Sequence, residues 1–234
     1  MSYRYAIYYA PAADDPLWTQ AANWLGRDPA GGVAPTTQIP GVARQELDRI
    51  STSARRYGFH ATLKAPMALA DEATRAALET ALAGFAAAAA PVAIGRLQLA
   101  SIDGFIALVP VRQSAALTDF AGKVVAAFDR FRAPMSTEER TKRIAPGRLD
   151  ARQIALLDQF GYPYVLEQFQ FHMTLTDRLS DADRQAAMAA AGAWFAPSLG
   201  RDLQVDRLTL FHEPQPGAPF DRVADFLLSG KEGP

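Results

Sequence analysis

The pentapeptide Phe59-His60-Ala61-Thr62-Leu63 returns as Phe171-His172-Met173-Thr174-Leu175, so the pattern F-H-x-T-L occurs twice in this chain of 234 residues. The second histidine follows the first by 112 positions, which is close to half of the chain. Each copy is followed by an R-L-x-L segment, Arg96-Leu97-Gln98-Leu99 and Arg207-Leu208-Thr209-Leu210, at offsets of 36 and 35 from the histidines. A repeat of this length predicts two similar lobes instead of a stack of short units.

The alternation within each pentapeptide predicts a strand with one chemical face. Side chains two positions apart point to the same side of a strand. His60 and Thr62 are therefore expected to project together, and His172 and Thr174 likewise, while the Phe, Leu and intervening residues face the core. Pseudo-symmetry between the lobes would then bring two imidazoles and two hydroxyls around one space.

The rest of the chain predicts an α+β fold. Hydrophobic residues make up 49% and charged residues 21%, enough for a packed core. We expect one bilobal domain over residues 1–234, with lobes of about 1–112 and 113–234, two antiparallel sheets lining a central cleft, and helices outside. Strand exchange between the lobes is left open. The expected strands cover 3–9, 57–63, 92–99, 105–111, 169–176, 203–211 and 220–228, and the expected helices cover 17–25, 71–90, 114–132, 150–160 and 180–194, the last capped by Ser180.

Composition excludes several classes of function. The chain has 24 Lys plus Arg, 25 Asp plus Glu and no Cys. A net charge of −1 disfavours extended nucleic acid but leaves an RNA end open, and the lack of Cys excludes disulfides and thiolate metal sites. No metal or other cofactor is expected, because the three His lack the spacing of a ligand set. P-loop, Rossmann and G-x-S-x-G motifs are also missing. No apolar run is long enough for a membrane span, and we expect a cytoplasmic protein.

Two imidazoles and two hydroxyls suit phosphate-ester chemistry. A neutral imidazole can take a proton from an attacking hydroxyl, and a protonated one can give a proton to the departing oxygen. Both forms are accessible near neutral pH because histidine titrates near 6.5. Threonine hydroxyls can hold the non-bridging phosphoryl oxygens without a metal.

Further residues are candidates for binding the substrate. By strand alternation Lys64 shares the face of His60 and Thr62 and could bind phosphate; the alternative is a solvated strand end. Guanidinium groups suit phosphate oxygens, and the candidates are Arg56, Arg132 and Arg143. Tyrosines that could stack on a base or sugar are Tyr5, Tyr57, Tyr162 and Tyr164. His212 is expected at the rim.

The paired H-x-T strands resemble the two-histidine (2H) phosphoesterase superfamily, which includes cyclic nucleotide phosphodiesterases and enzymes that process RNA 2′,3′-cyclic phosphates. Longer segments resemble the branch of phosphonate-metabolism proteins encoded with carbon–phosphorus lyase genes. The resemblance covers nearly the whole chain and rests on residues 4–8, 24–28, 57–64, 131–134, 161–165 and 169–176.

This resemblance implies that His60, Thr62, His172 and Thr174 form the catalytic set. The expected activity is a metal-independent phosphodiesterase acting on a small cyclic sugar or nucleotide phosphate. A phosphonate link points to a cyclic ribose phosphate, and the superfamily points to a 2′,3′-cyclic nucleotide or RNA end. The alternative is a module that binds a nucleotide or phosphosugar without turnover.

Overall fold

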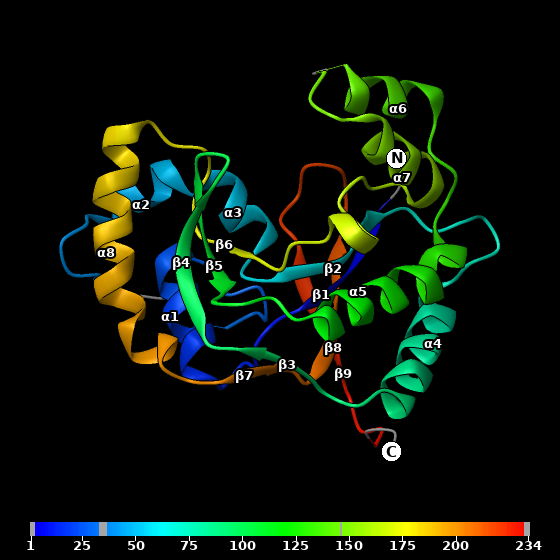
Figure 1. Ribbon diagram of the computed structural model, residues 1–234, viewed down its shortest axis with the longest axis horizontal. Helices are drawn as coiled ribbons and strands as arrows, with labels where there is room; N and C mark the ends of the chain where they lie inside the picture. The colour runs from blue at the N-terminus through cyan, green and yellow to red at the C-terminus, as the bar shows by residue number, and fades with distance from the viewer. Residues whose placement is uncertain (1–2, 33–36, 146, 232–234) are drawn as a thin grey trace.

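Antiparallel strands carry both histidine motifs in the computed structural model, which describes residues 3–32, 37–145 and 147–231 (Figure 1). Within these residues the strands form three sheets. The four-stranded sheet has the order β2 (Ala61–Met67), β1 (Arg4–Tyr9), β8 (Arg207–Glu213) and β9 (Asp221–Leu227). The three-stranded sheet has the order β4 (Leu97–Ile102), β5 (Phe105–Pro110) and β6 (Met173–Thr174), and β3 (Val92–Gly95) pairs with β7 (Leu203–Val205).

Helices pack against the sheets and confirm the α+β class. In Figure 1, α1, α2 and α8 gather beside the three-stranded sheet, while α4 and α5 lie beside the four-stranded one. The helices are α1 (Pro16–Leu25), α2 (Arg44–Ile50), α3 (Thr52–Tyr57), α4 (Arg75–Ala88), α5 (Ala115–Phe128), α6 (Thr137–Ile144), α7 (Ala151–Phe160) and α8 (Asp181–Leu199), with short 3₁₀ turns η1 (Asp129–Phe131) and η2 (Leu166–Gln168). No helix in the described residues combines the length and apolarity needed to cross a bilayer.

The sheets do not follow the two halves of the sequence. β8 and β9 from the second half join β1 and β2 from the first, and β6 from the second half joins β4 and β5. Each histidine motif therefore sits in a sheet made by both halves. The lobe boundary near residue 112 stays a prediction.

Several elements differ from the sequence-based expectation for local reasons. The segment expected as a strand over 57–63 begins with the end of α3, and pairing starts at Ala61. The strand expected over 169–176 is paired as a strand only at β6: before it the Gln113 side chain accepts the Phe171 N–H at 2.8 Å, and after it the Leu175 and Thr176 N–H groups both donate to the Ile106 carbonyl. Helix α6 was not expected; it has no buried residue, so it lacks the apolar periodicity of a core helix. Ser180 caps α8 as predicted, accepting from the Asp183 N–H.

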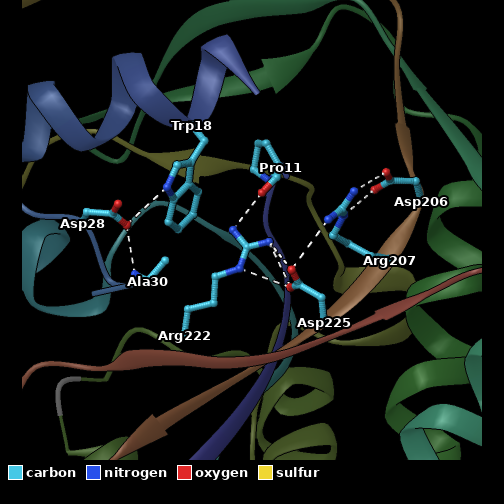
Figure 2. Close-up of polar contacts among 8 residues, drawn as sticks. All are labelled: Pro11, Trp18, Asp28, Ala30, Asp206, Arg207, Arg222 and Asp225. Carbon is cyan, nitrogen blue, oxygen red and sulfur yellow. Dashed lines mark hydrogen bonds and ion pairs between the residues drawn. The ribbon is translucent and has the colours of Figure 1, made fainter. Parts of the chain in front are cut away.

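A buried arginine ties the β8–β9 hairpin to α1 (Figure 2). The Arg222 side chain is 4% exposed, and its guanidinium lies 4.6 Å from the centre of the Trp18 ring. It donates to the Pro11 carbonyl at 2.8 Å and to Asp225 at 2.7 Å. The Trp18 indole N–H in turn donates to Asp28 at 3.2 Å. This contact set joins the end of β1 and helix α1 to β9.

Replacing Arg222 tests how much this contact set stabilises the fold. Arg222→Ala leaves the Pro11 carbonyl without its donor, leaves Asp225 with only the longer ion pair to Arg207 at 3.6 Å, and removes the cation from Trp18. We expect a loss of about 2 to 4 kcal/mol in the free energy of unfolding, measured by urea denaturation. Arg75→Ala is the control, because Arg75 pairs with Glu79 on an exposed helix face and should change stability by less than about 1 kcal/mol. Equal denaturation midpoints for Arg222→Ala and the unmodified protein would contradict this role.

Candidate active site

Both H-x-T motifs line one cavity of about 650 Å³. His60 and Thr62 reach it from the start of β2, and His172 and Thr174 reach it from the segment that contains β6. The intervening side chains are buried as expected, which leaves the His and Thr side chains facing the cavity. The other lining residues are Tyr8, Ser53, Ala54, Tyr57, Gly58, Ala65, Pro66, Phe105, Tyr162, Thr176, Asp177 and Arg178.

The two imidazoles are held in the same way. The Nδ1 atom of His60 lies 2.8 Å from the carbonyl oxygen of Gly58, and Nδ1 of His172 lies 2.8 Å from that of Gln170. In both motifs the partner is the carbonyl two residues earlier. A carbonyl only accepts, so Nδ1 carries the proton and Nε2 keeps its lone pair in the neutral ring. Each histidine is thus oriented with Nε2 available for proton transfer.

Burial keeps both rings neutral in the free protein. Burial, together with a smaller effect of His172, lowers the pKa of His60 to about 4 against the opposing effect of the Gly58 carbonyl. Burial also lowers the pKa of His172. At neutral pH both Nε2 atoms can therefore accept a proton, and an anionic ligand would favour the protonated form of either ring.

An aromatic shell surrounds the histidines. The Tyr8 ring stacks on His60 with 3.7 Å between ring centroids, and Tyr57 lies 6.3 Å from the same imidazole. Phe105 lies 5.7 Å from His172. Tyr8 is buried, and burial raises the pKa of its phenol well above the ordinary value, so the ring stays neutral. Sequence analysis predicted Tyr57 as a site residue but missed Tyr8, because no motif marks which tyrosine of residues 3–9 faces His60.

Lys64 does not share the face of His60 and Thr62, so that prediction is wrong. Tyr8 pairs with Thr62 and Ile7 pairs with Lys64, so two steps along β2 match one step along β1. This bulge reverses the alternation after Thr62. The Lys64 side chain is 3% exposed and its Nζ lies 2.5 Å from Asp129 Oδ1. Lys64 is neither a cavity residue nor a solvated strand end.

The predicted arginines bind other parts of the protein. Arg132 binds both carboxylate oxygens of Asp129 at 2.9 and 3.1 Å and donates to the Gln159 carbonyl at 2.9 Å. Arg143 donates to the Gly161 carbonyl at 2.9 Å. Both line a separate hollow of about 120 Å³ and not the histidine cavity.

Arg56 is held by a buried carboxylate. It pairs with Glu213, which also pairs with Arg4, and it donates to the Ala218 carbonyl at 3.1 Å. The Arg56 side chain is not among the residues that line the histidine cavity. The structure brings none of the three predicted arginines to the histidines.

The remaining predicted aromatic residues divide between two places. Tyr162 and Tyr164 pack edge to face at 5.5 Å and line an adjoining cavity of about 370 Å³, and Tyr162 also lines the histidine cavity. Burial raises the pKa of Tyr162 to about 12. Tyr5 instead stacks on His212 with 4.8 Å between ring centroids. Neither Tyr5 nor His212 lines the histidine cavity.

Asp177 and Arg178 line the cavity and were missed by sequence analysis. The Asp177 carboxylate accepts the Ser53 N–H at 2.9 Å and the Ala54 N–H at 3.3 Å. The Ala54 carbonyl accepts the Gly58 N–H at 2.9 Å, and Gly58 is the residue that orients His60. This chain of hydrogen bonds joins the second motif to the first histidine. Alternation from His172 places Arg178 on the same face, and this signal could have found it.

Comparison with known proteins identifies the family. A family model described as "Protein of unknown function (DUF1045)" matches residues 62–221. The chain belongs to the DUF1045 family. This membership agrees with the resemblance of the sequence to the two-histidine phosphoesterases and their phosphonate-linked branch.

Two relatives of this DUF1045 chain are named "Ribose 1,5-bisphosphate phosphokinase PhnN". The protein from Janthinobacterium sp. (strain Marseille) is 41% identical and the one from Laribacter hongkongensis (strain HLHK9) is 37% identical, each over 97% of this chain. The matches cover 51% and 53% of the relatives, so the chain spans about half of their length.

Two solved structures of E. coli LigT also match. The complex with 3′-AMP is 13% identical, covers 98% of this chain and 99% of LigT, and has a TM-score of 0.44. The complex with ATP is 11% identical, covers 97% and 98%, and has a TM-score of 0.40.

The lowered histidine pKa values predict how stability depends on pH. Between pH 6.5 and about 4 the unfolded chain binds a proton at position 60 that the folded protein does not. Folding stability should therefore fall as the pH drops through this window. In a His60→Gln variant the fall should be smaller, as measured by urea denaturation at pH 4.5 and 7. An NMR titration should show the His60 ring neutral at pH 6, and a midpoint near 6.5 would refute the effect of burial.

Proposed function

We propose that this protein is a metal-independent phosphodiesterase that opens a small cyclic sugar or nucleotide phosphate. The observation that carries the proposal is the matched orientation of His60 and His172 in one cavity. Each ring has its Nδ1 bound to a carbonyl, which leaves two Nε2 atoms for two proton transfers. Thr62 and Thr174 supply hydroxyl donors beside them.

The reaction needs one histidine in each protonation state. The neutral Nε2 takes a proton from water, and the water oxygen forms a bond to phosphorus. The bond from phosphorus to one ring oxygen breaks, and the protonated Nε2 gives its proton to that oxygen. The product is a phosphate monoester. The threonine hydroxyls donate to the non-bridging oxygens as charge develops there.

Substrate binding supplies the protonated histidine. Both rings are neutral in the free cavity because burial lowers their pKa values. A bound phosphate anion stabilises an imidazolium and raises its pKa. Because both rings titrate as a coupled pair, the proton taken up on binding can reside on either one.

The size of the cavity favours a small substrate. A volume of about 650 Å³ lies within the range of small-molecule sites. The relatives are named for ribose 1,5-bisphosphate, which favours a cyclic ribose phosphate over an RNA end. This chain lacks the G-x-x-x-x-G-K-[ST] motif of P-loop kinases. We therefore assign the phosphokinase activity in those names to the part of the relatives that this chain does not cover.

A substrate screen tests the activity. Cyclic and linear phosphodiesters are incubated with the protein in excess EDTA, and products are followed by phosphorus NMR. We expect a cyclic ribose phosphate to give a monoester at an unchanged rate in EDTA. Loss of turnover on chelation, restored by one divalent ion, would point to a metallohydrolase. Affinity without product would point to a binding module.

Single substitutions test the roles of the four residues. His60→Ala or His172→Ala should lower turnover by about 100- to 10,000-fold, the usual effect of one acid–base group. The double variant should lose much less than the product of both effects, since the two act as a unit. His212→Ala is the control, because this third histidine does not line the cavity. Wild-type turnover by a folded His60→Ala or His172→Ala protein would exclude that histidine from catalysis.

The threonines should have smaller effects. Thr62→Ala or Thr174→Ala should lower turnover by about 10- to 1,000-fold, because a donor to the phosphoryl oxygens is lost. Thr62→Ser and Thr174→Ser keep the hydroxyl and should retain most of the activity. Equal losses in the Ala and Ser variants would mean that the methyl group matters and the hydroxyl does not.

A further inference from the structure

A second cavity of about 370 Å³ adjoins the histidine cavity. The two share Thr62, Phe105, Tyr162, His172 and Arg178 as lining residues. His60 lines only the first. A substrate whose phosphate lies between the two histidines would therefore have the second cavity on its His172 side, where the rest of the molecule could extend.

Arg178 is the one Lys or Arg among the described residues that line either cavity. Its side chain is 58% exposed and makes one long ion pair, with Nη2 3.5 Å from Asp103 Oδ2. Asp103 is itself 71% exposed at the β4–β5 turn. Such a solvated pair is weak, so the guanidinium can turn to a ligand at low cost. Arg132, by contrast, binds both oxygens of Asp129 and the Gln159 carbonyl.

The position of this charge indicates what it recognises. Arg178 lies on the wall common to both cavities. The other polar groups that line the adjoining cavity are amides, phenols, Thr62, His172 and one carboxylate, Asp103, which is the solvated partner of Arg178. Amides and phenols bind sugar hydroxyls and do not balance the charge of a phosphate. A guanidinium fork matches phosphate oxygens in pairs.

We propose that Arg178 binds a second, non-reacting phosphate ester of the substrate, so that the preferred substrate is a cyclic phosphate whose sugar carries another phosphate group. This inference rests on the proposed function for the reaction itself. Arg178 acts here as a specificity residue that contacts the substrate away from the bond that breaks.

The test uses two substrates that differ only in the second phosphate: adenosine 2′,3′-cyclic phosphate and its 5′-phosphorylated derivative. The wild-type protein should prefer the 5′-phosphorylated compound in kcat/KM by about 10- to 100-fold, the effect of hydrogen bonds to a charged group. Arg178→Gln should bring this ratio to within about threefold of one, and Arg178→Glu should invert it.

Arg96→Gln is the matched control. Arg96 is 67% exposed and forms one long ion pair, 4.0 Å from Asp202, and it lines neither cavity. This variant should keep the wild-type ratio. The proposal would be overturned if Arg178→Gln kept the wild-type kcat/KM on both substrates, or if kcat/KM fell equally on both. The second result would place Arg178 on the reacting phosphate.

Binding measurements separate this inference from the proposed reaction. If neither substrate is turned over, the proposed function fails, and calorimetry with 2′-AMP and adenosine 2′,5′-bisphosphate still tests Arg178. Tighter binding of the bisphosphate that is lost in Arg178→Gln supports the second phosphate site. Equal binding of both ligands, or binding of neither, overturns it.

Discussion

The antiparallel pairing of β1 with two strands from different halves of the chain is the constraint on which the site depends. β1 is hydrogen-bonded to β2 on one side and to β8 on the other. Tyr8 pairs with Thr62 across the first boundary and with Thr209 across the second. The strand that carries Thr62 is therefore aligned by a strand that the second half holds in place. The cavity cannot form in either half alone, because each sheet is completed by the other half.

The sequence predicted what depends on local pattern. The repeated pentapeptide and its matched offsets indicated two related strands, and the alternation within each predicted which side chains face the core. Ser180 was predicted as a cap because capping depends on residues adjacent in the chain. His60 and His172 share one cavity, as the repeated motif predicted.

What the sequence could not predict depends on partners distant in the chain. Lys64 leaves the cavity face because of a bulge opposite Ile7 and Tyr8. Regular pairing of the second motif does not extend back to Phe171, because the Gln113 side chain accepts the Phe171 N–H. Arg56, Arg132 and Arg143 carry the same side chain as Arg178. Only the tertiary partners of each arginine decide which guanidinium faces the cavity.

The aromatic contacts have a spectroscopic consequence. Each of the three histidines lies beside a different aromatic ring: His60 against Tyr8 at 3.7 Å, His212 against Tyr5 at 4.8 Å, and His172 near Phe105 at 5.7 Å. Ring currents shift protons above an aromatic face by an amount that falls steeply with distance. We therefore expect the fold to separate the imidazole proton signals, with those of His60 shifted furthest upfield. Separate signals would allow each histidine to be followed by NMR in the unmodified protein.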